Sequence, residues 1–388
     1  MKVGVEIYVN QVYGLICRIY NGKDNQNELL LFYVLEVLAL PLLIQKSWVV
    51  FVYAITISIE SIVIEYLTTR STIQVSPILL SAISITLGGI MLMMVTLLVL
   101  KKKEGIAILF LKSWKNLLLA SLFLSIGIFT WYDSINRIGA SKELLIAGPL
   151  EIVIIVLLAR VFLRETLKNI HIIGIALALF GFVLAIMSDS SISEDKENIG
   201  WNGLPNVSTL PNTFNITFGD MEAILSAFGF ALGVLFLTKL VSRHSSIEVA
   251  SSSMLISGFI LVGFLILGLL LDEMQHPSTS GTSILTYSTE NSQQLILIVV
   301  ILILFSLLPF VGSLSYSTGL SRIGASLTAT IGSSSILITL VAQLLLVEAG
   351  VPSNLPNNIF LAVLGGIIGF LGIYIIHMRD YSLYSTRS

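Results

Sequence analysis

Three glutamates stand inside long apolar segments of the chain, where a charged side chain is costly. Glu60 lies in the apolar run 48–67, and Glu143 and Glu151 lie in the run 142–163. The last two are eight residues apart (151 − 143), so they share one face if the run is helical. A carboxylate inside a membrane costs several kcal/mol unless it meets a partner, a cation or a proton. We therefore expect Glu60, Glu143 and Glu151 to bind a positive group of a substrate or to carry a proton. A hydrogen bond between packed helices is the alternative.

Polar and aromatic residues accompany these glutamates and are further candidates for substrate contact. Tyr53 and Thr56 precede Glu60 by seven and four residues, which places all three along one side of a helix. The other candidates lie within or at the ends of two further apolar runs: Trp131, Tyr132, Asp133, Ser313 and Tyr316. For the aromatic residues the alternative is the interfacial belt, where Trp and Tyr are common. Lys142 could dock a substrate carboxylate, although a lysine at a helix end more often extends its amine toward the membrane surface.

The composition indicates that the elements carrying these residues are membrane helices. Apolar residues make up 55% of the 388 residues, charged residues only 11%, and the mean hydropathy is +0.94. Soluble domains carry about a quarter charged residues, and a helix needs roughly 20 apolar residues to cross a bilayer. Ten runs are long enough: residues 48–67, 77–100, 117–136, 142–163, 169–187, 221–241, 247–271, 294–320, 325–347 and 359–377. The predicted fold class is therefore an all-α polytopic membrane protein with ten transmembrane helices.

The N-terminal residues 1–46 do not fit this series of ten helices. Their apolar run, 29–44, is short and is interrupted by Glu36 and Pro41. Sixteen residues are marginal for a membrane crossing, which takes roughly 20. We expect an arm that contains an interfacial helix, with one extra membrane helix as the alternative.

One short motif occurs twice and divides the chain into two halves. Asn136 begins NRIGAS, and Ser321 begins SRIGAS, 185 residues later (321 − 136). Repetition at a fixed offset is the signature of duplicated structure. Five membrane helices per half is an odd number, so the two halves must enter the membrane in opposite orientations, the inverted-repeat plan of secondary carriers. We therefore divide the chain into an arm 1–46, a first repeat 47–187, a linker 188–218, a second repeat 219–378 and a tail 379–388.

Basic residues predict which side of the membrane each loop faces, because short loops rich in Lys and Arg stay in the cytoplasm. The turn that starts at Lys101 contains three lysines in succession, whereas the linker 188–218 has Lys196 as its only base. Both ends of the ten-helix core are therefore expected in the cytoplasm, with the linker outside. Two sequons in the linker, at Asn206 and Asn215, are candidate glycosylation sites.

Charge and cysteine content argue against several classes of function. The net charge is −2, without the basic surface that nucleic-acid binding needs. The chain has one cysteine, Cys17, and four scattered histidines, so we expect no metal site and no cofactor. It also lacks the HExxH motif of a metalloprotease. An enzyme is therefore not expected.

Each half carries residues typical of one known family. The first half has, in order, WYDS at 131–134, IGAS at 138–141, Pro149, Glu165, Gly174 and Gly181. The second half matches with Tyr316, IGAS at 323–326, Glu348, Gly365, Gly369 and Gly372, but has Ser334 where the pattern has proline. In these positions both halves resemble the EamA domain of the drug/metabolite transporter superfamily. The glycines are expected to allow close contact between helices.

The resemblance implies a carrier for small molecules. We expect an exporter of small metabolites, amino acids or drug-like compounds that works by alternating access in the cell (plasma) membrane, with proton coupling. Its expected partners are a small-molecule substrate and the lipid bilayer, and a homodimer is left open. The alternatives are a nucleotide-sugar or other metabolite exchanger, and a membrane receptor or scaffold that has lost transport.

Overall fold

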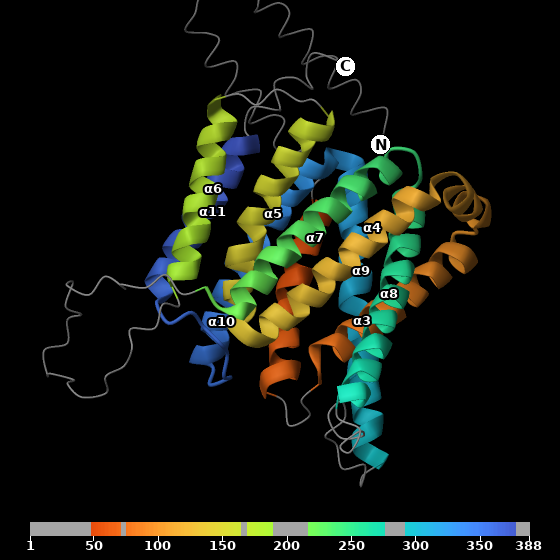
Figure 1. Ribbon diagram of the computed structural model, residues 1–388, viewed down its shortest axis with the longest axis horizontal. Helices are drawn as coiled ribbons and strands as arrows, with labels where there is room; N and C mark the ends of the chain where they lie inside the picture. The colour runs from red at the N-terminus through yellow and green to blue at the C-terminus, as the bar shows by residue number, and fades with distance from the viewer. Residues whose placement is uncertain (1–47, 71–74, 164–168, 189–215, 276–291, 378–388) are drawn as a thin grey trace, which may run out of the picture. The chain divides into compact units, whose positions relative to one another are not determined.

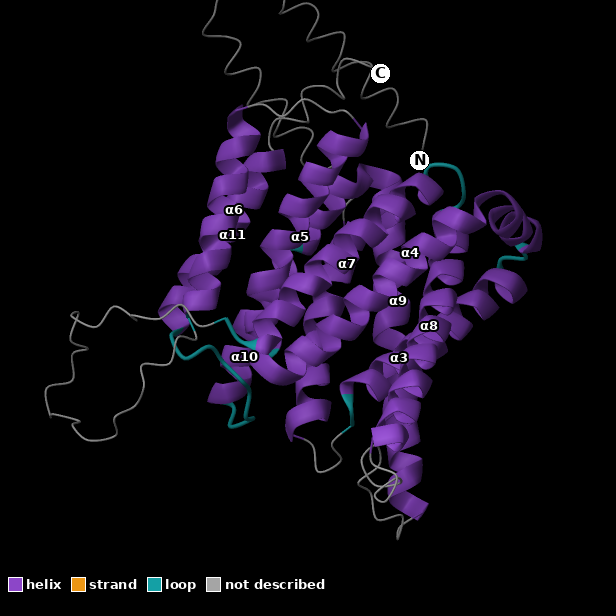
Figure 2. Cartoon of the chain, viewed as in Figure 1, coloured by secondary structure: helices purple, strands orange, loops and turns teal. Residues whose placement is uncertain are grey.

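The computed structural model of the chain describes residues 48–70, 75–163, 169–188, 216–275 and 292–377 (Figure 1). In these ranges the regular elements are all helices, and none is a strand (Figure 2). The arm 1–46, the tail 379–388 and the sequons at Asn206 and Asn215 lie outside the described residues, so what was expected of them stays a prediction.

The helices follow one another along the chain in the following order. The first helix, here called the first span, runs from Trp48 to Thr69 and ends in the π-helical turn η1, Tyr66–Arg70. The others are α3 (Pro77–Met94, continued by the π-helical η2, Val95–Val99), α4 (Lys103–Ile138), α5 (Ala140–Leu163), α6 (Asn169–Met187), α7 (Phe218–Val241), α8 (Ser246–Gln275), α9 (Ser292–Gly332), α10 (Ser334–Glu348) and α11 (Ile359–His377).

The helices confirm the predicted fold class. Among the described residues, nine helices are long and apolar enough to cross a membrane. The tenth helix of the set is α5, which carries Lys142, Glu143 and Glu151 and packs against α6 and α7. The protein is therefore an all-α polytopic membrane protein built as two repeats.

Two predicted helices differ from the observed ones. The third was expected from residue 117, but α4 begins at Lys103 and bends at Ser113, whose backbone is not helical (φ −128°, ψ 15°). The ninth, expected over 325–347, begins after the non-helical backbone at Gly324 inside α9 and forms the apolar span Leu327–Glu348, with one turn residue, Ser333, between α9 and α10. The equivalent place in α5 holds Pro149, which lacks an N–H and removes one backbone hydrogen bond. Equivalent positions of the two repeats therefore differ: Pro149 lies inside the continuous helix α5, whereas a turn residue separates α9 from α10.

The repeated IGAS motif adopts the same backbone conformation in both halves. Gly139 has φ +84° and ψ 160°, and Gly324 has φ +82° and ψ 169°. Side-chain-bearing residues are strained there, which explains a glycine in both copies. The backbone N–H of Ala140 donates to Glu65 near the end of the first span (2.8 Å), whereas Gly319, close to Gly324, packs against Val50 at its start. The two copies thus lie at opposite ends of the bundle, as an inverted repeat requires.

Equivalent helices of the two repeats pack against each other. The second helices, α3 and α8, form one such pair, and the fifth helices, α6 and α11, form another. A Cβ placed on Gly181 would come within 2.5 Å of the backbone N of Gly369, so these helices touch through backbone atoms. The expected close packing at glycines is confirmed for this pair. Buried serines link α4 to α8, where Ser125 Oγ donates to the carbonyl of Ser257 (3.1 Å).

Candidate functional site

A cavity of about 180 Å³ lies between the two repeats. Its wall is built by the first span and by residues of α3, α4, α5, α7, α8, α9 and α10, whereas α6 and α11 contribute no lining residue. Most of the lining is apolar. The charged residues that line it are Glu60, Glu143 and Glu151, and no lysine, arginine or histidine is among the described lining residues. The site is therefore an apolar chamber that holds three carboxyl groups and, among the described lining residues, no basic side chain.

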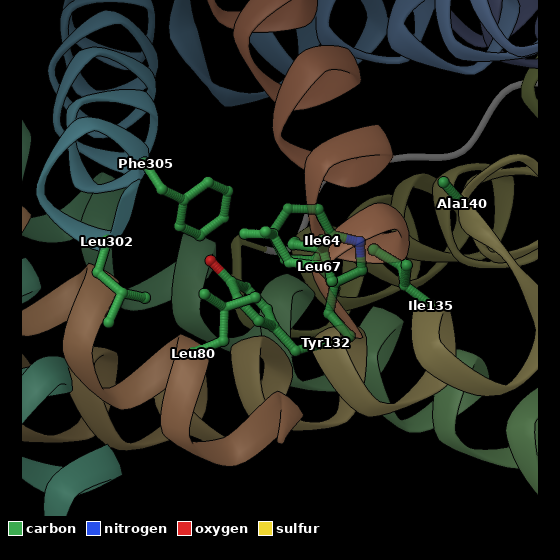
Figure 3. Close-up of a cluster of buried hydrophobic side chains, with 9 residues drawn as sticks. Ile64, Leu67, Leu80, Tyr132, Ile135, Ala140, Leu302 and Phe305 are labelled. Carbon is green, nitrogen blue, oxygen red and sulfur yellow. The ribbon is translucent and has the colours of Figure 1, made fainter. Parts of the chain in front are cut away.

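Glu60 is held in place by a hydrogen-bonded tyrosine. The Tyr132 hydroxyl donates to Glu60 Oε1 (2.8 Å), and the Ser84 hydroxyl lies 3.2 Å from the same tyrosine oxygen. The Tyr132 ring is buried among Leu80, Leu302 and Phe305 (Figure 3). Tyr132 thus lies behind the cavity wall. It fixes Glu60 instead of facing a substrate.

Glu143 and Glu151 project from α5 into the same cavity, as their spacing predicts. The Ser226 hydroxyl of α7 donates to Glu143 Oε1 (3.1 Å), while Glu143 Oε2 is buried without a hydrogen-bond partner. Glu151 is only partly buried, and within the described part of the chain no hydrogen bond or ion pair involves it. It is the carboxylate most available to a ligand.

Aromatic rings complete the chamber. Tyr53 of the first span and Tyr316 of α9 pack with their ring centroids 4.7 Å apart, and Trp131 packs edge-on against Phe230 of α7 (6.0 Å). The Tyr316 hydroxyl is buried and has no hydrogen-bond partner among the described residues. Trp131 is only 5% exposed and lines the cavity, so the alternative of an interfacial belt does not hold for it.

The remaining predicted site residues lie at different distances from the chamber. Ser313 lines it. Thr56 does not, because its hydroxyl donates to the Val52 carbonyl of its own helix (2.7 Å). Asp133 also lies outside it, where it pairs with Arg137 (2.9 Å) on the exposed side of α4. The ion pair of Arg137 with Glu222 (3.0 Å) continues this surface network onto α7.

The expectation for Lys142 was wrong. Its side chain is 1% exposed and does not reach the membrane surface; instead it pairs with Asp220 of α7 (2.8 Å), which is fully buried. Two buried opposite charges satisfy each other where a single one would be very costly. The pair therefore ties the start of α5 to the start of α7.

Glu65 was not among the predicted site residues. Its carboxylate accepts hydrogen bonds from the Ala140 backbone (2.8 Å), Gln343 Nε2 (2.6 Å) and the Ser353 hydroxyl (3.0 Å), and also from the Asn354 backbone. Gln343 and Ser353 belong to the second repeat, so one buried carboxylate joins both repeats at the end of the bundle that holds Gly139. In the sequence, Glu65 continues a polar stripe with Ser58 and Ser61 on a helix face beside that of Glu60.

A metal ion is not suggested by this geometry. Within the described ranges, no group of three or more His, Cys, Asp or Glu side chains could hold one. The three glutamates are spread around the chamber on the first span and α5, so a molecule larger than an ion could contact them together.

Comparisons with known proteins agree with this architecture. A solved structure described as "Crystal structure of protein" superposes with a TM-score of 0.52 at 14% sequence identity, covering 86% of this chain and 98% of that chain, which supports the fold alone. No curated protein matches the chain. Among protein-family models, the one for the "EamA-like transporter family" matches residues 46–187 and 217–378. That match spans both repeats and most of the chain, and the family consists of transporters, not enzymes. The chain is thus an integral membrane protein that belongs to the EamA-like transporter family of the drug/metabolite transporter superfamily.

Proposed function

We propose that this protein is a secondary transporter that exports small molecules carrying a positively charged group, by alternating access and in exchange for protons. One observation supports this proposal above all: Glu60, Glu143 and Glu151 line one chamber that contains no basic lining residue in the described part of the chain. Buried carboxylates need a cation or a proton to offset their charge. A cationic substrate and a proton can therefore compete for the same groups, which couples their movements in opposite directions.

Alternating access requires that one end of the bundle be closed while the other opens. At the end that holds Gly139, the two repeats are joined by the Glu65 hydrogen bonds to Gln343 and Ser353. The buried Lys142–Asp220 pair reinforces the same end. Since these contacts are polar and specific, they can break and re-form as a unit. We take them as the closed gate of this state.

The orientation that we propose places this gate on the outer side of the plasma membrane. At the other end, Lys102 donates to the Ser245 hydroxyl (2.7 Å) and lies 3.6 Å from Glu248. The basic turns near residues 101 and 243 therefore lie together, and by the positive-inside rule they face the cytoplasm. Export would then proceed from the side of these turns toward the gate.

A nucleotide-sugar exchanger is less compatible with the chamber. Phosphate groups are recognised by Arg, Lys or backbone N–H groups, and a chamber with three glutamates would repel them. We therefore favour a cation or a zwitterion as the cargo. A scaffold that has lost transport would need the contacts that join the two repeats. It would not need three buried carboxyl groups in the chamber, so the scaffold alternative leaves them unexplained.

The test uses purified protein in proteoliposomes. A thermal-shift screen of amines and amino acids first identifies a ligand, since binding to the folded state raises the unfolding temperature. Uptake of that ligand is then driven by an imposed pH gradient, with Glu151→Gln as the variant and Glu348→Gln, an exposed position outside the chamber, as the matched control. We expect Glu151→Gln to reduce gradient-driven uptake at least ten-fold and the control to leave it unchanged. Undiminished, pH-dependent uptake by Glu151→Gln would refute the proposal.

A further inference from the structure

The first ten residues of α4, 103–112, are not needed to cross the membrane. Beyond the bend at Ser113, residues 114–138 alone extend about 37 Å at about 1.5 Å per residue, which is enough for a bilayer core of about 30 Å. Figure 1 shows the start of α4 nearly end-on at the edge of the bundle, whereas α5, α7 and α11 run lengthwise. The segment is therefore turned roughly across the direction of the other helices.

Hydrogen bonds hold the segment in this position at both of its ends. The Ser113 hydroxyl and His244 Nε2 are 3.0 Å apart at the bend, and Lys102 donates to Ser245 just before the segment starts. Both partners belong to the connection between α7 and α8. The bend is thus fixed by contacts to the bundle, and the orientation of residues 103–112 follows from it.

The outward face of the segment is apolar. Ile106 and Leu109 are buried against the bundle, while Phe110 and Leu111 are exposed, Leu111 by 79%. Trp114, just beyond the bend, is 52% exposed. A helix that lies roughly parallel to the membrane plane and exposes such residues can bury them by inserting its apolar face into the boundary between lipid headgroups and acyl chains.

Lysines flank this apolar face on both sides. Lys101 and Lys103 precede it, and Lys112 and Lys115 follow it. None of the four forms an ion pair within the described residues, since Lys102 is the lysine that turns back to Glu248. Glu104 is the only acid between residues 101 and 115, so the segment has a charge of +4 (five lysines minus one glutamate). Clusters of basic residues beside a membrane helix attract anionic lipids.

We propose that residues 101–115 form an interfacial helix that binds the anionic phospholipids of the bilayer surface. The apolar face enters the headgroup boundary, and Lys101, Lys103, Lys112 and Lys115 at its two ends contact phosphate and other acidic headgroup oxygens. Because Ser113 and Lys102 contact the connection between α7 and α8, a bound lipid is linked directly to the bundle. The positive charge of the segment favours an anionic partner, and its exposed apolar face favours a partner that also has an apolar part, as a phospholipid does.

The test measures lipid binding to the full-length protein in neutral detergent, with fluorescently labelled phosphatidylglycerol and phosphatidylcholine as probes. In the variant Lys101→Gln/Lys103→Gln/Lys112→Gln/Lys115→Gln we expect at least ten-fold weaker binding of phosphatidylglycerol and unchanged binding of phosphatidylcholine. Glu104→Gln removes the one acidic side chain between residues 101 and 115 and should strengthen phosphatidylglycerol binding. Misfolding could explain a loss of binding but could not explain this gain. Two double variants separate this site from general surface charge. Lys112→Gln/Lys115→Gln removes two lysines of the segment, and Lys239→Gln/Arg322→Gln removes two exposed bases elsewhere.

Each outcome decides the proposal. A loss in the segment variants that exceeds the loss in Lys239→Gln/Arg322→Gln supports it. Equal losses in both double variants, or no loss in the quadruple variant, overturn it. If Leu111→Ser changes the mass of the particle in light scattering while lipid binding stays the same, the apolar face is covered by a second copy of the chain instead, and the proposal also fails.

Discussion

Replacing each of the two IGAS glycines by alanine gives a direct test of the inverted repeat. Gly139 and Gly324 share nearly the same backbone conformation, with φ of +84° and +82°. Their surroundings differ. A Cβ on Gly139 would lie 2.6 Å from the carbonyl oxygen of Asn354, whereas a Cβ on Gly324 would have no atom of the described residues within 4 Å beyond its own stretch of helix. Both substitutions therefore strain the backbone, and only Gly139→Ala also creates a steric clash.

The shared cost is backbone strain. A residue with a side chain at this φ and ψ costs about 1–3 kcal/mol, which sets the expected loss of unfolding free energy for Gly324→Ala. At Gly139 the new methyl must also displace backbone at Asn354, and overpacking of this kind costs about 1–3 kcal/mol more. We therefore expect Gly139→Ala to lose about 2–6 kcal/mol. Asn354 also donates to Glu65, so moving it weakens the contact between the repeats.

The assay is reversible unfolding in mixed micelles by increasing SDS, followed by circular dichroism. Both variants should unfold at lower SDS than the parent chain, and Gly139→Ala at the lowest. Gly139→Ser serves as a further check, because a larger side chain should not relieve the clash. Equal destabilisation by the two alanine variants would show that the Asn354 contact does not matter. A loss confined to Gly324→Ala would refute the reasoning about both positions.

Two further predictions concern the polar contacts at the same end of the bundle and use the same unfolding assay. Lys142→Met leaves Asp220 without its ion-pair partner and should lose about 3–5 kcal/mol, whereas Lys142→Met/Asp220→Asn should recover most of that loss, because neither charge remains and the amide oxygen can still accept from the Thr217 backbone N–H. A double variant as unstable as the single one would contradict this. Glu65→Ala leaves several buried donors without an acceptor and should lose about 3 kcal/mol or more; Glu65→Gln, which keeps one acceptor oxygen, should lose less. A loss for Glu65→Ala below that of the exposed control Glu348→Ala would contradict the role of Glu65.

Much of the fold was predictable because it depends on local properties of the chain. Long apolar runs fix the helices, and the repeated IGAS motif reveals the duplication together with its two positive-φ glycines. The bend at Ser113 was not predictable, since residues 103–112 are apolar enough to continue either a straight or a bent helix. Its direction depends on His244, which is 131 residues away in sequence.

The candidate site was predictable in part for the same reason. Glu143 and Glu151 share a helix face by spacing alone, and the structure places that face against the chamber. Lys142 and Glu65 could not be interpreted in this way, because their partners lie in other helices. Glu65 accepts from Gln343, 278 residues away. From a single sequence, nothing indicates that Glu65 binds this distant glutamine and not lipid, water or substrate.

The two repeats have similar backbone arrangements but different charged residues. This difference affects how a molecule would bind in the chamber. Glu151 and Ile336 occupy equivalent places, 185 residues apart (336 − 151), and both line the cavity. The carboxylates of the chamber come from the first repeat, while the second repeat contributes hydroxyl groups such as those of Ser313 and Tyr316. A cationic group would therefore bind against the first repeat, with the rest of the molecule toward the second. Such a substrate has one preferred orientation, although the frame around it is nearly symmetric. Under the function proposed above, the cation would stay with the same carboxylates while the repeats exchange conformations, and a proton would replace it on release.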